Sequence, residues 1–298
     1  MTILYTIFMN LNRGYLMILG AGVCWATTGL FGTILFRQGI DPLLVASSRL
    51  SLAAIFFFLL LFFRFRTSLI IKFAALPRLF IFGLLGVALF NVFYLHAIDN
   101  LGVSVAVALL YTAPAFVIIV SRLFLKEWIT PVKSVALLLT TIGVFLVVGT
   151  YDFTRWTLEP RGIALGVGAG FTFGLISIFS KVALRRHTEF TITFYFILTG
   201  AILLSLLKPP WLLLLGKISP ATLPALLALA LISTFLPYLL YISGLKYLEA
   251  GKGSIVAAVE PVAAFSFAAL FLGERLLVPQ FIGFIFVVGA VLLLVYKS

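Results

Sequence analysis

The chain has 298 residues, of which 63% are hydrophobic and 10% charged, and its formal net charge is +12. Ordinary soluble domains are about 45–50% apolar and about 25% charged, and a soluble globule needs a polar exterior that this composition does not supply. The composition therefore excludes a soluble enzyme, a nucleic-acid-binding domain and a disordered chain, and it predicts an integral membrane protein.

Ten apolar stretches are each long enough to cross a bilayer as a helix, which takes about 20 residues. The apolar runs are continuous rather than alternating, so we expect helices and not the strands of a barrel. In chain order the predicted spans are Gly14–Phe36, Pro42–Phe63, Leu79–Ala97, Gly102–Phe124, Val132–Thr150, Gly162–Ser180, Phe190–Leu207, Leu223–Leu245, Gly251–Leu272 and Pro279–Tyr296.

Lysine and arginine are distributed unequally between the two sets of loops. If the N-terminus is cytoplasmic, fourteen of them fall in cytoplasmic segments and six in external segments, and Arg49 lies within a span. Positively charged loops tend to stay in the cytoplasm. We therefore predict a multi-pass protein of the cytoplasmic membrane with both termini in the cytoplasm.

The two halves of the sequence resemble each other. A shift of 148 residues places Gly20-Ala21-Gly22 on Gly168-Ala169-Gly170, and a shift of 147 places Pro114 on Pro261. Matched glycines and prolines are more informative than matched leucines, because leucine is common in every apolar helix. The sequence therefore predicts an internal repeat.

Each predicted repeat, residues 14–150 and residues 161–297, contains five spans. Because five is odd, the second copy must be inverted in the membrane relative to the first, and the loops that carry most positive charge change parity between the halves accordingly. The predicted fold is all-α, with ten transmembrane helices arranged as two inverted five-helix repeats. This arrangement is typical of alternating-access transporters.

Several short motifs occur in order along both halves. They are YTAPAF around Pro114, LFLKE ending at Glu127, Glu260-Pro261 within GKGSIVAAVEPVAAF, LFLGE ending at Glu274, and Arg49-Leu50 at the start of the second span. On these motifs the chain resembles the ten-helix, EamA-type members of the drug/metabolite transporter superfamily, over about residues 14–297. The resemblance implies a substrate cavity between the halves that opens alternately to each side, in a family whose members export amino acids, amines and other small metabolites.

Residues about ten positions into a span lie near the bilayer midplane. This criterion selects Trp25, Asn91, Tyr111, Thr112, Phe173, Thr234 and Glu260.

Glu260 is the candidate for substrate binding and for proton coupling. An acid at mid-membrane must be neutralised, paired or wetted by a cavity, and Pro261 loosens its helix. Its counterpart in the first half is Ala113, so repeat symmetry does not require the charge. The alternative is a packed glutamate, bonded to hydroxyl or backbone groups, with no role in transport.

Arg49 is the second candidate for substrate binding. It either binds a substrate carboxylate, extends its charged group to the membrane surface, or caps carbonyls of a broken neighbouring helix.

The remaining candidates for substrate binding are aromatic or amide side chains. Such rings either line a cavity, where they stack on rings, aliphatic chains or cations, or are ordinary aromatic residues of lipid-facing helices. These candidates are Trp25, Asn91, Tyr94, Tyr111, Phe173 and Tyr241.

Small residues four apart mark one face of the sixth span, at Gly166, Gly170 and Gly174. This spacing lets helices approach closely, and the contact is either fixed packing or a gating contact between the halves. Pro114 and Pro261 are the matching candidates for flexible points in their helices.

We predict a secondary transporter that moves a small metabolite, with an amino acid or a related zwitterion or amine as the expected substrate and export as the expected direction. No catalytic residue, metal or cofactor is expected, and the expected partners are the lipid bilayer, the small-molecule substrate and, as a candidate coupling ion, protons, but not nucleic acid. A membrane-embedded enzyme and a channel-like facilitator are the alternatives. The enzyme is disfavoured because two distant histidines and one deep acid do not assemble an active site.

Overall fold

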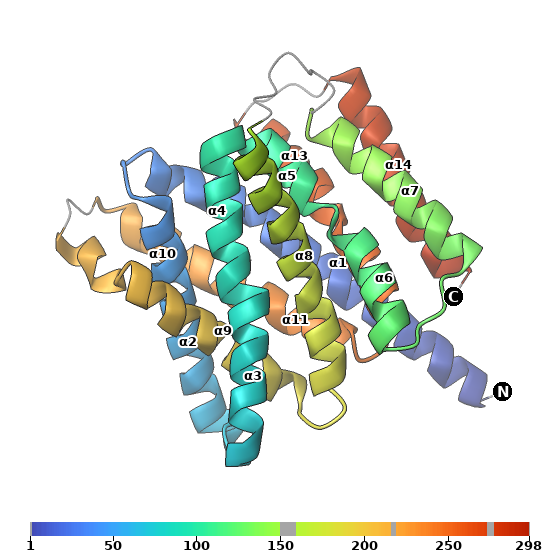
Figure 1. Cartoon of the computed structure of the whole chain (residues 1–298), viewed down its shortest axis with the longest axis horizontal. Helices are drawn as coiled ribbons and strands as arrows, with labels where there is room; N and C mark the ends of the chain where they lie inside the picture. The colour runs from blue at the N-terminus through green and yellow to red at the C-terminus, as the bar shows by residue number, and fades with distance from the viewer. Residues whose placement is uncertain (1, 150–158, 216–218, 273–276, 298) are drawn as a thin grey trace.

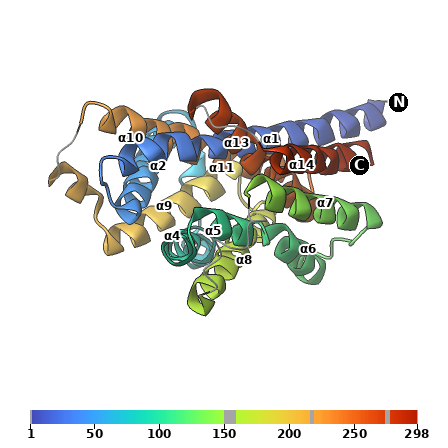
Figure 2. The same ribbon diagram turned by 90° about the horizontal axis from the view of Figure 1, so that it is seen from above.

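A computed structural model describes residues 2–149, 159–215, 219–272 and 277–297 of the chain. Within these ranges the protein is helical and has no β-strand. Figures 1 and 2 show the helices packed side by side as a bundle, with the two chain ends on the same side.

The first half contains five spans, of which three are continuous helices and two are interrupted. The described elements are α1 (Thr2–Phe36), α2 (Pro42–Arg64), η1 (Arg66–Ser68), η2 (Phe73–Ala75), α3 (Leu76–Gly83), η3 (Leu84–Ala88), α4 (Leu89–Leu101), α5 (Val103–Leu110), α6 (Ala113–Phe124) and α7 (Pro131–Val147). Helix α1 begins at Thr2, well before the start predicted at Gly14.

The second half repeats this order. Its described elements are α8 (Pro160–Ala183), α9 (Glu189–Leu207), η5 (Pro210–Leu215), α10 (Thr222–Ala230), η6 (Leu231–Phe235), α11 (Leu236–Gly244), α12 (Ala250–Ala257), α13 (Val259–Leu272) and α14 (Val278–Tyr296). Among the described residues nine helical segments are apolar and long enough to cross a membrane, and α7, with 17 residues, is a shorter apolar helix. The predicted set of ten spans is thus confirmed, with the fifth somewhat short.

Proline and a preceding acceptor side chain start several of these helices. The Asp41 carboxylate accepts the backbone N–H of Leu44 at 2.9 Å just before Pro42, and the Glu159 carboxylate accepts that of Gly162 at 2.7 Å just before Pro160. Proline fits the first turn because the N–H that it lacks would be unpaired there, and the acceptor satisfies one of the free donors.

The first helix of each repeat packs on the third and fourth spans of the other repeat. Helix α1 packs on α11 and α13, while α8 packs on α4 and α6; α2 packs on α9, and α7 on α14. Helix α8 runs antiparallel to α4, since Gly162 lies against Leu101 and Gly86 against Ile176. These pairings confirm the predicted fold of two inverted five-helix repeats.

The fourth span of each repeat is broken, which corrects the continuous helices expected at residues 102–124 and 251–272. The first break lies at Tyr111 and Thr112, and the second at Ala258, which is 147 residues after Tyr111. Each break precedes a proline, Pro114 or Pro261, by three residues. Proline lacks the N–H that would bond the carbonyl four residues earlier, and its ring crowds that carbonyl, so the helix is interrupted.

The third span of each repeat contains a π-helical segment that hydropathy did not predict. These segments are η3, between α3 and α4, and η6, between α10 and α11. They begin 147 residues apart, so both repeats carry the same irregularity at the same position.

The loops predicted to be cytoplasmic gather at one end of the bundle. Thr191 donates to the Ser68 carbonyl at 2.9 Å, and Lys246 pairs with Glu189 at 3.0 Å. Both chain ends lie at this end too, because a Cβ on Gly14 would lie 2.9 Å from Leu248, and Figure 1 shows the two ends on one side.

Candidate functional site

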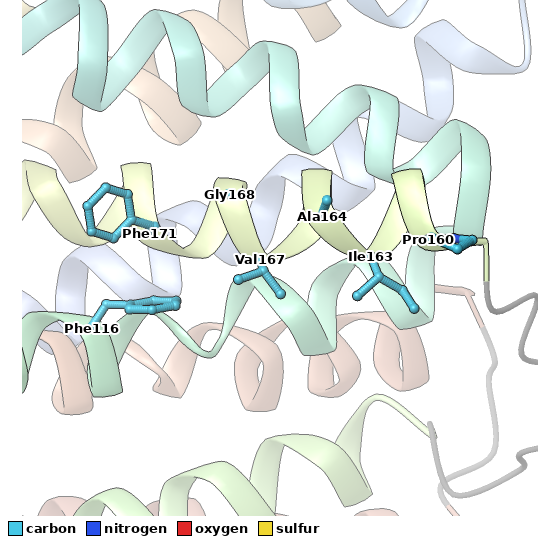
Figure 3. A pocket seen from close by; sticks show the side chains of 7 residues that line it. All are labelled: Phe116, Pro160, Ile163, Ala164, Val167, Gly168 and Phe171. Carbon is cyan, nitrogen blue, oxygen red and sulfur yellow. The ribbon is translucent and has the colours of Figure 1, made fainter.

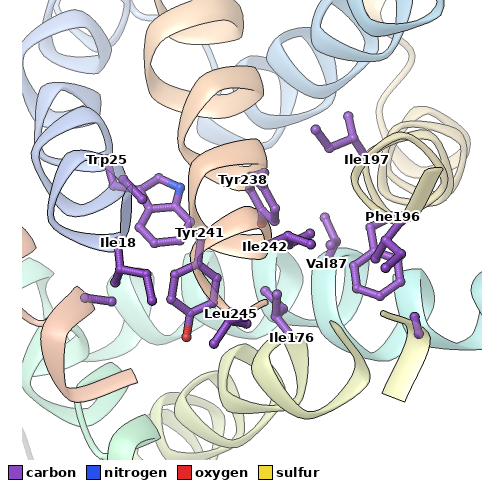
Figure 4. Close-up of a cluster of buried hydrophobic side chains, with 14 of the residues drawn as sticks. Ile18, Trp25, Val87, Ile176, Phe196, Ile197, Tyr238, Tyr241, Ile242 and Leu245 are labelled. Atoms are coloured by element: carbon purple, nitrogen blue, oxygen red, sulfur yellow. The ribbon is translucent and has the colours of Figure 1, made fainter. Parts of the chain in front are cut away.

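An aromatic cluster centred on Trp25 of α1 lies at the middle of the bundle. Its ring centroid is 5.8 Å from that of Phe173 on α8, 5.7 Å from Tyr238 and 5.3 Å from Tyr241, both on α11. Figure 4 shows Trp25 facing the two tyrosines. The edge-on and tilted geometries are those that aromatic rings prefer, so the cluster joins α1 of one repeat to α8 and α11 of the other.

The cluster continues along α4. Phe173 lies 5.1 Å from Phe90, and the Phe90 ring stacks on Tyr94 at 5.7 Å. The predicted candidates Trp25, Phe173, Tyr94 and Tyr241 therefore belong to one connected set of rings, in which Phe90 and Tyr238 are the members that the sequence did not select.

Arg49 of α2 connects both repeats by hydrogen bonds. One terminal nitrogen donates to Thr234 Oγ1 and the other to Asn91 Oδ1, each at 2.9 Å. The Asn91 side chain donates in turn to the Val87 carbonyl at 2.8 Å. Of the three roles considered for Arg49, extension to the membrane surface is thereby contradicted, because its donors are directed to side chains inside the bundle.

Glu260 of α13 lies near the second helix break, close to Tyr111 at the first. The Tyr111 hydroxyl faces the Glu260 carboxyl, and it has no hydrogen-bond partner within bonding distance among the described residues. Tyr94 is also within electrostatic range of Glu260. The structure therefore places Glu260, Tyr111 and Tyr94 together.

Arg49 and Glu260 interact electrostatically but do not form an ion pair. Each is within range of the other's charge, yet no carboxylate of the described residues approaches the Arg49 nitrogens within 4.0 Å. Both side chains are half-buried. Two opposite charges inside a membrane protein that do not pair directly are unfavourable unless water or a ligand solvates them, so these two side chains are suited to binding a charged solute.

Two hydroxyl groups at the site were not among the predicted substrate-binding residues. Ser177 of α8 lies 2.7 Å from the Tyr241 hydroxyl, and Thr234, although close to the midplane by depth, was not singled out as a ligand-binding residue. For Tyr238, which was also missed, the internal repeat offered a signal. A shift of 147 residues places Tyr238 on Asn91, which was a predicted candidate.

The glycines of α8 pack closely against the broken helix of the first repeat. A Cβ on Gly166 would lie 2.5 Å from Leu109, one on Gly170 would lie 2.8 Å from the Leu109 carbonyl oxygen, and one on Gly174 would lie 3.1 Å from Val117. In the other repeat Gly22, the counterpart of Gly170, faces the second break in the same way. The backbone next to the break thus approaches the glycine face of α8, and Pro114 lies two residues after Thr112.

An ionic cluster links the repeats at the end of the bundle that carries the positive loops. The Glu127 carboxylate accepts the N–H groups of Ala250 and Gly251 at 2.7 and 3.2 Å, at the start of α12. Lys133, whose side chain is 2% exposed, lies 2.7 Å from Glu249 and 4.0 Å from Glu127. Glu127 therefore stabilises the start of a neighbouring helix, whereas its counterpart Glu274 lies outside the described residues.

An apolar groove runs along the outer side of α8, shown in Figure 3, and it contains none of the predicted binding residues. It is lined by Phe116, Pro160, Ile163, Ala164, Val167, Gly168 and Phe171. Because these side chains carry no polar group, the groove suits lipid acyl chains rather than a charged solute.

Comparison with known proteins adds three findings. The sequence model of the EamA-like transporter family matches residues 12–149 and 160–296. An uncharacterized transporter of Archaeoglobus fulgidus is 31% identical over 214 residues, 70% of this chain and 75% of the relative. The pseudopaline exporter CntI of Pseudomonas aeruginosa is 30% identical over 121 residues, 41% of each chain.

The fold also matches a solved crystal structure. That structure has a TM-score of 0.82 and 15% sequence identity, and the match covers 96% of this chain and 98% of the other. At this identity the likeness establishes the fold alone.

Proposed function

This chain belongs to the EamA-like transporter family, and we propose that it is a secondary transporter that exports a small zwitterion, an amino acid or a related amine, by alternating access. Its transported solute binds between the two repeats. The family model matches residues 12–149 and 160–296, and we take residues 14–150 and 161–297 as the two five-helix repeats.

The arrangement of Arg49 and Glu260 carries the proposal for the substrate. The two opposite charges face one region of the bundle without pairing to each other, and a zwitterion has the complementary charges. Its carboxylate binds Arg49 and its ammonium group binds Glu260, while Trp25, Tyr94 and Tyr111 contact its apolar part. Exclusion of water strengthens both ionic contacts.

The inverted repeats support alternating access. Each repeat contributes one broken helix, and both breaks lie beside a glycine of the opposite repeat's first helix, at Gly170 and Gly22. Transporters built from inverted repeats use broken helices at the midplane for binding and rock one repeat against the other. Rocking about the close glycine contacts exchanges an outward-facing form for an inward-facing one.

The excess of lysine and arginine at one end of the bundle supports the orientation. We place that end, with both chain termini, in the cytoplasm, and the cytoplasmic membrane is the site of action. The exporter CntI, related over 41% of this chain, supports export as the direction.

Glu260 also serves as the proton-coupling residue. A carboxyl group among Tyr94, Tyr111 and Arg49 can be charged when it binds an ammonium group and neutral when the site is empty. Exchange of a proton for the substrate then couples export to the proton gradient.

Reconstitution into liposomes tests this function. The purified protein is assayed for counterflow of a radiolabelled amino acid, an amine and an organic acid, with and without a pH gradient. Saturable counterflow of the amino acid, stimulated by the gradient, is expected; absence of counterflow for all three solutes would refute the function. A channel-like facilitator would give flux without counterflow, and a membrane-embedded enzyme would change the solute chemically.

The Glu260→Gln variant tests coupling separately. Counterflow by this variant should lose its stimulation by the pH gradient, whereas Asp99→Asn, in which the exposed Asp99 is altered, should behave as the wild type. Full activity of Glu260→Gln with an unchanged pH dependence would contradict the coupling role.

A further inference from the structure

The two π-helical segments occupy equivalent positions in the two repeats. They are η3 (Leu84–Ala88) and η6 (Leu231–Phe235). A π-helical turn shifts the hydrogen-bond register by one residue, is rare, and is often found at functional sites. Its occurrence twice, at matching positions of the third spans, indicates that the irregularity belongs to the working of the bundle.

A polar side chain is bonded to the backbone at each π segment. At η3 the Asn91 side chain donates to the Val87 carbonyl, and at η6 the Thr234 hydroxyl donates to the Leu229 carbonyl, both at 2.8 Å. The sequence separation in the second bond is five residues, which is the spacing of a π turn. Each side chain therefore stabilises its own irregular segment.

Arg49 holds both of these side chains at once. Its guanidinium donates to Asn91 Oδ1 and to Thr234 Oγ1, each at 2.9 Å. One charged group on α2 thus ties a π segment of its own repeat to the π segment of the other repeat. No other described side chain is hydrogen-bonded to residues at both segments.

We propose that Arg49 is a clamp on the two π segments and that a substrate carboxylate opens it. Both present acceptors are neutral, whereas a carboxylate binds a guanidinium through two parallel, charge-assisted hydrogen bonds that are roughly twice as strong. A bound carboxylate therefore takes the donors from Asn91 and Thr234. This step rests on the proposed function only in requiring that the substrate carry a carboxylate.

Opening the clamp links binding to the movement of the repeats. With Arg49 engaged, α2 and η6 are joined across the repeat boundary near mid-membrane. Once Arg49 turns to the carboxylate, that joint is lost and each π segment keeps only the bond from its own side chain to the backbone. A ligand shifts a conformational equilibrium only through contacts that differ between the states. The exchange of acceptors at Arg49 supplies such a difference.

Hydrogen–deuterium exchange of the purified protein in nanodiscs tests the clamp without any substrate. In the Arg49→Gln variant, amides in both π segments should exchange about tenfold faster than in the wild type, because a hydrogen bond to a charged group is lost at each. Arg49→Lys keeps the charge but lacks the planar guanidinium that donates to two acceptors at once. In this variant amide exchange should stay slow in one π segment at most. Wild-type protection of both segments in either variant would overturn the clamp.

Thr234→Val gives a test that does not depend on removing the arginine. This variant removes the hydrogen bond between Arg49 and Thr234 and keeps the one between Arg49 and Asn91. Amide exchange should therefore rise in residues 231–235 and stay unchanged in residues 84–88. Thr193→Val is the matched control, since Thr193 is equally buried and donates to the Glu189 carbonyl at 2.7 Å without contact to Arg49. It should leave both segments at wild-type rates, and a rise in both segments in Thr193→Val would overturn the assignment.

Three small probes test the opening step. Saturating 3-phenylpropanoate or L-phenylalanine, each with a carboxylate, should accelerate exchange in both wild-type segments about tenfold, whereas 2-phenylethylamine should leave them unchanged. In Arg49→Gln the two carboxylates should cause no further increase in the exchange rate of either π segment. Equal effects of the amine and the carboxylates, or no effect of either carboxylate, would refute opening by a carboxylate.

The outcomes separate this inference from the proposed function. Transport in liposomes with unaltered exchange in Arg49→Gln would refute the clamp and leave the transporter standing. Faster exchange in Arg49→Gln without counterflow of any solute would leave the clamp standing and refute the proposed function.

Discussion

Replacing Gly170 by alanine tests a close contact between the repeats. A Cβ at this position would lie 2.6 Å from Thr112 Oγ1, 2.8 Å from the Leu109 carbonyl oxygen and 3.0 Å from the Leu110 carbonyl oxygen, where ordinary contacts begin at 3.4 Å. Two of the three neighbours are backbone oxygens at the end of α5, just before the helix break, so they cannot turn aside as a flexible side chain would. Helix α8 and the break must move apart.

The expected change in the free energy of unfolding is a balance of two terms. Overpacking of this kind costs about 1–3 kcal/mol, while alanine in place of glycine stabilises a helix by about 0.5–1 kcal/mol. The net loss is about 0–2.5 kcal/mol, and each kcal/mol lost lowers the midpoint of thermal unfolding by roughly 2–4 °C. Gly170→Leu adds further carbons at the same place and should prevent folding or counterflow.

Gly289→Ala is the matched control, because Gly289 is also within a helix and a Cβ there meets no atom within 4 Å. Its unfolding midpoint in detergent, followed by fluorescence-detected size exclusion after heating, should equal or exceed that of the wild type. If Gly170→Ala were as stable as Gly289→Ala and equally active in counterflow, the glycine face of α8 would not be a close contact and the reasoning would fail.

The same thermal assay checks two further predictions. Glu127→Ala removes the acceptor at the start of α12 and weakens the pairing of the buried Lys133, so it should lower the free energy of unfolding by about 3 kcal/mol. Lys246→Ala breaks a more exposed ion pair and should lower the free energy of unfolding by about 0–1 kcal/mol. Equal losses in the two variants would contradict the distinction between a buried and an exposed pair. Tyr241→Phe removes the hydroxyl contact with Ser177 and should cost about 1 kcal/mol, whereas Ser177→Ala in the Tyr241→Phe background should add little; full additivity of the two changes would contradict that contact.

The order of the helices and the inverted repeat could be predicted from the sequence. Long apolar runs have one solution in lipid, because every backbone N–H and C=O must be bonded within the segment. The matched prolines, Pro114 and Pro261, marked the fourth spans, which hydropathy alone predicts as continuous helices. The breaks three residues before each proline emerged in the structure.

The candidate site was predicted in part. Depth along a span selected Trp25, Phe173 and Asn91, which the structure places beside other candidates, because distance from the membrane surface follows directly from residue count in a helix. Depth does not tell which side of a helix faces the centre of the bundle. Tyr238 was therefore missed, although it packs on Trp25 at 5.7 Å.

By itself the sequence determined that this protein lies in a membrane, how many transmembrane spans it has and that its two halves are inverted. These features follow from hydropathy, charge and an odd number of spans in each half. Tertiary structure decided the partners of Arg49 and Glu260 and the presence of η3 and η6. Thr234 lies 185 residues from Arg49 in the chain, and a π turn changes hydrogen-bond register without changing composition. Such contacts depend on how helices are rotated and packed against each other, and no local pattern of residues specifies that rotation.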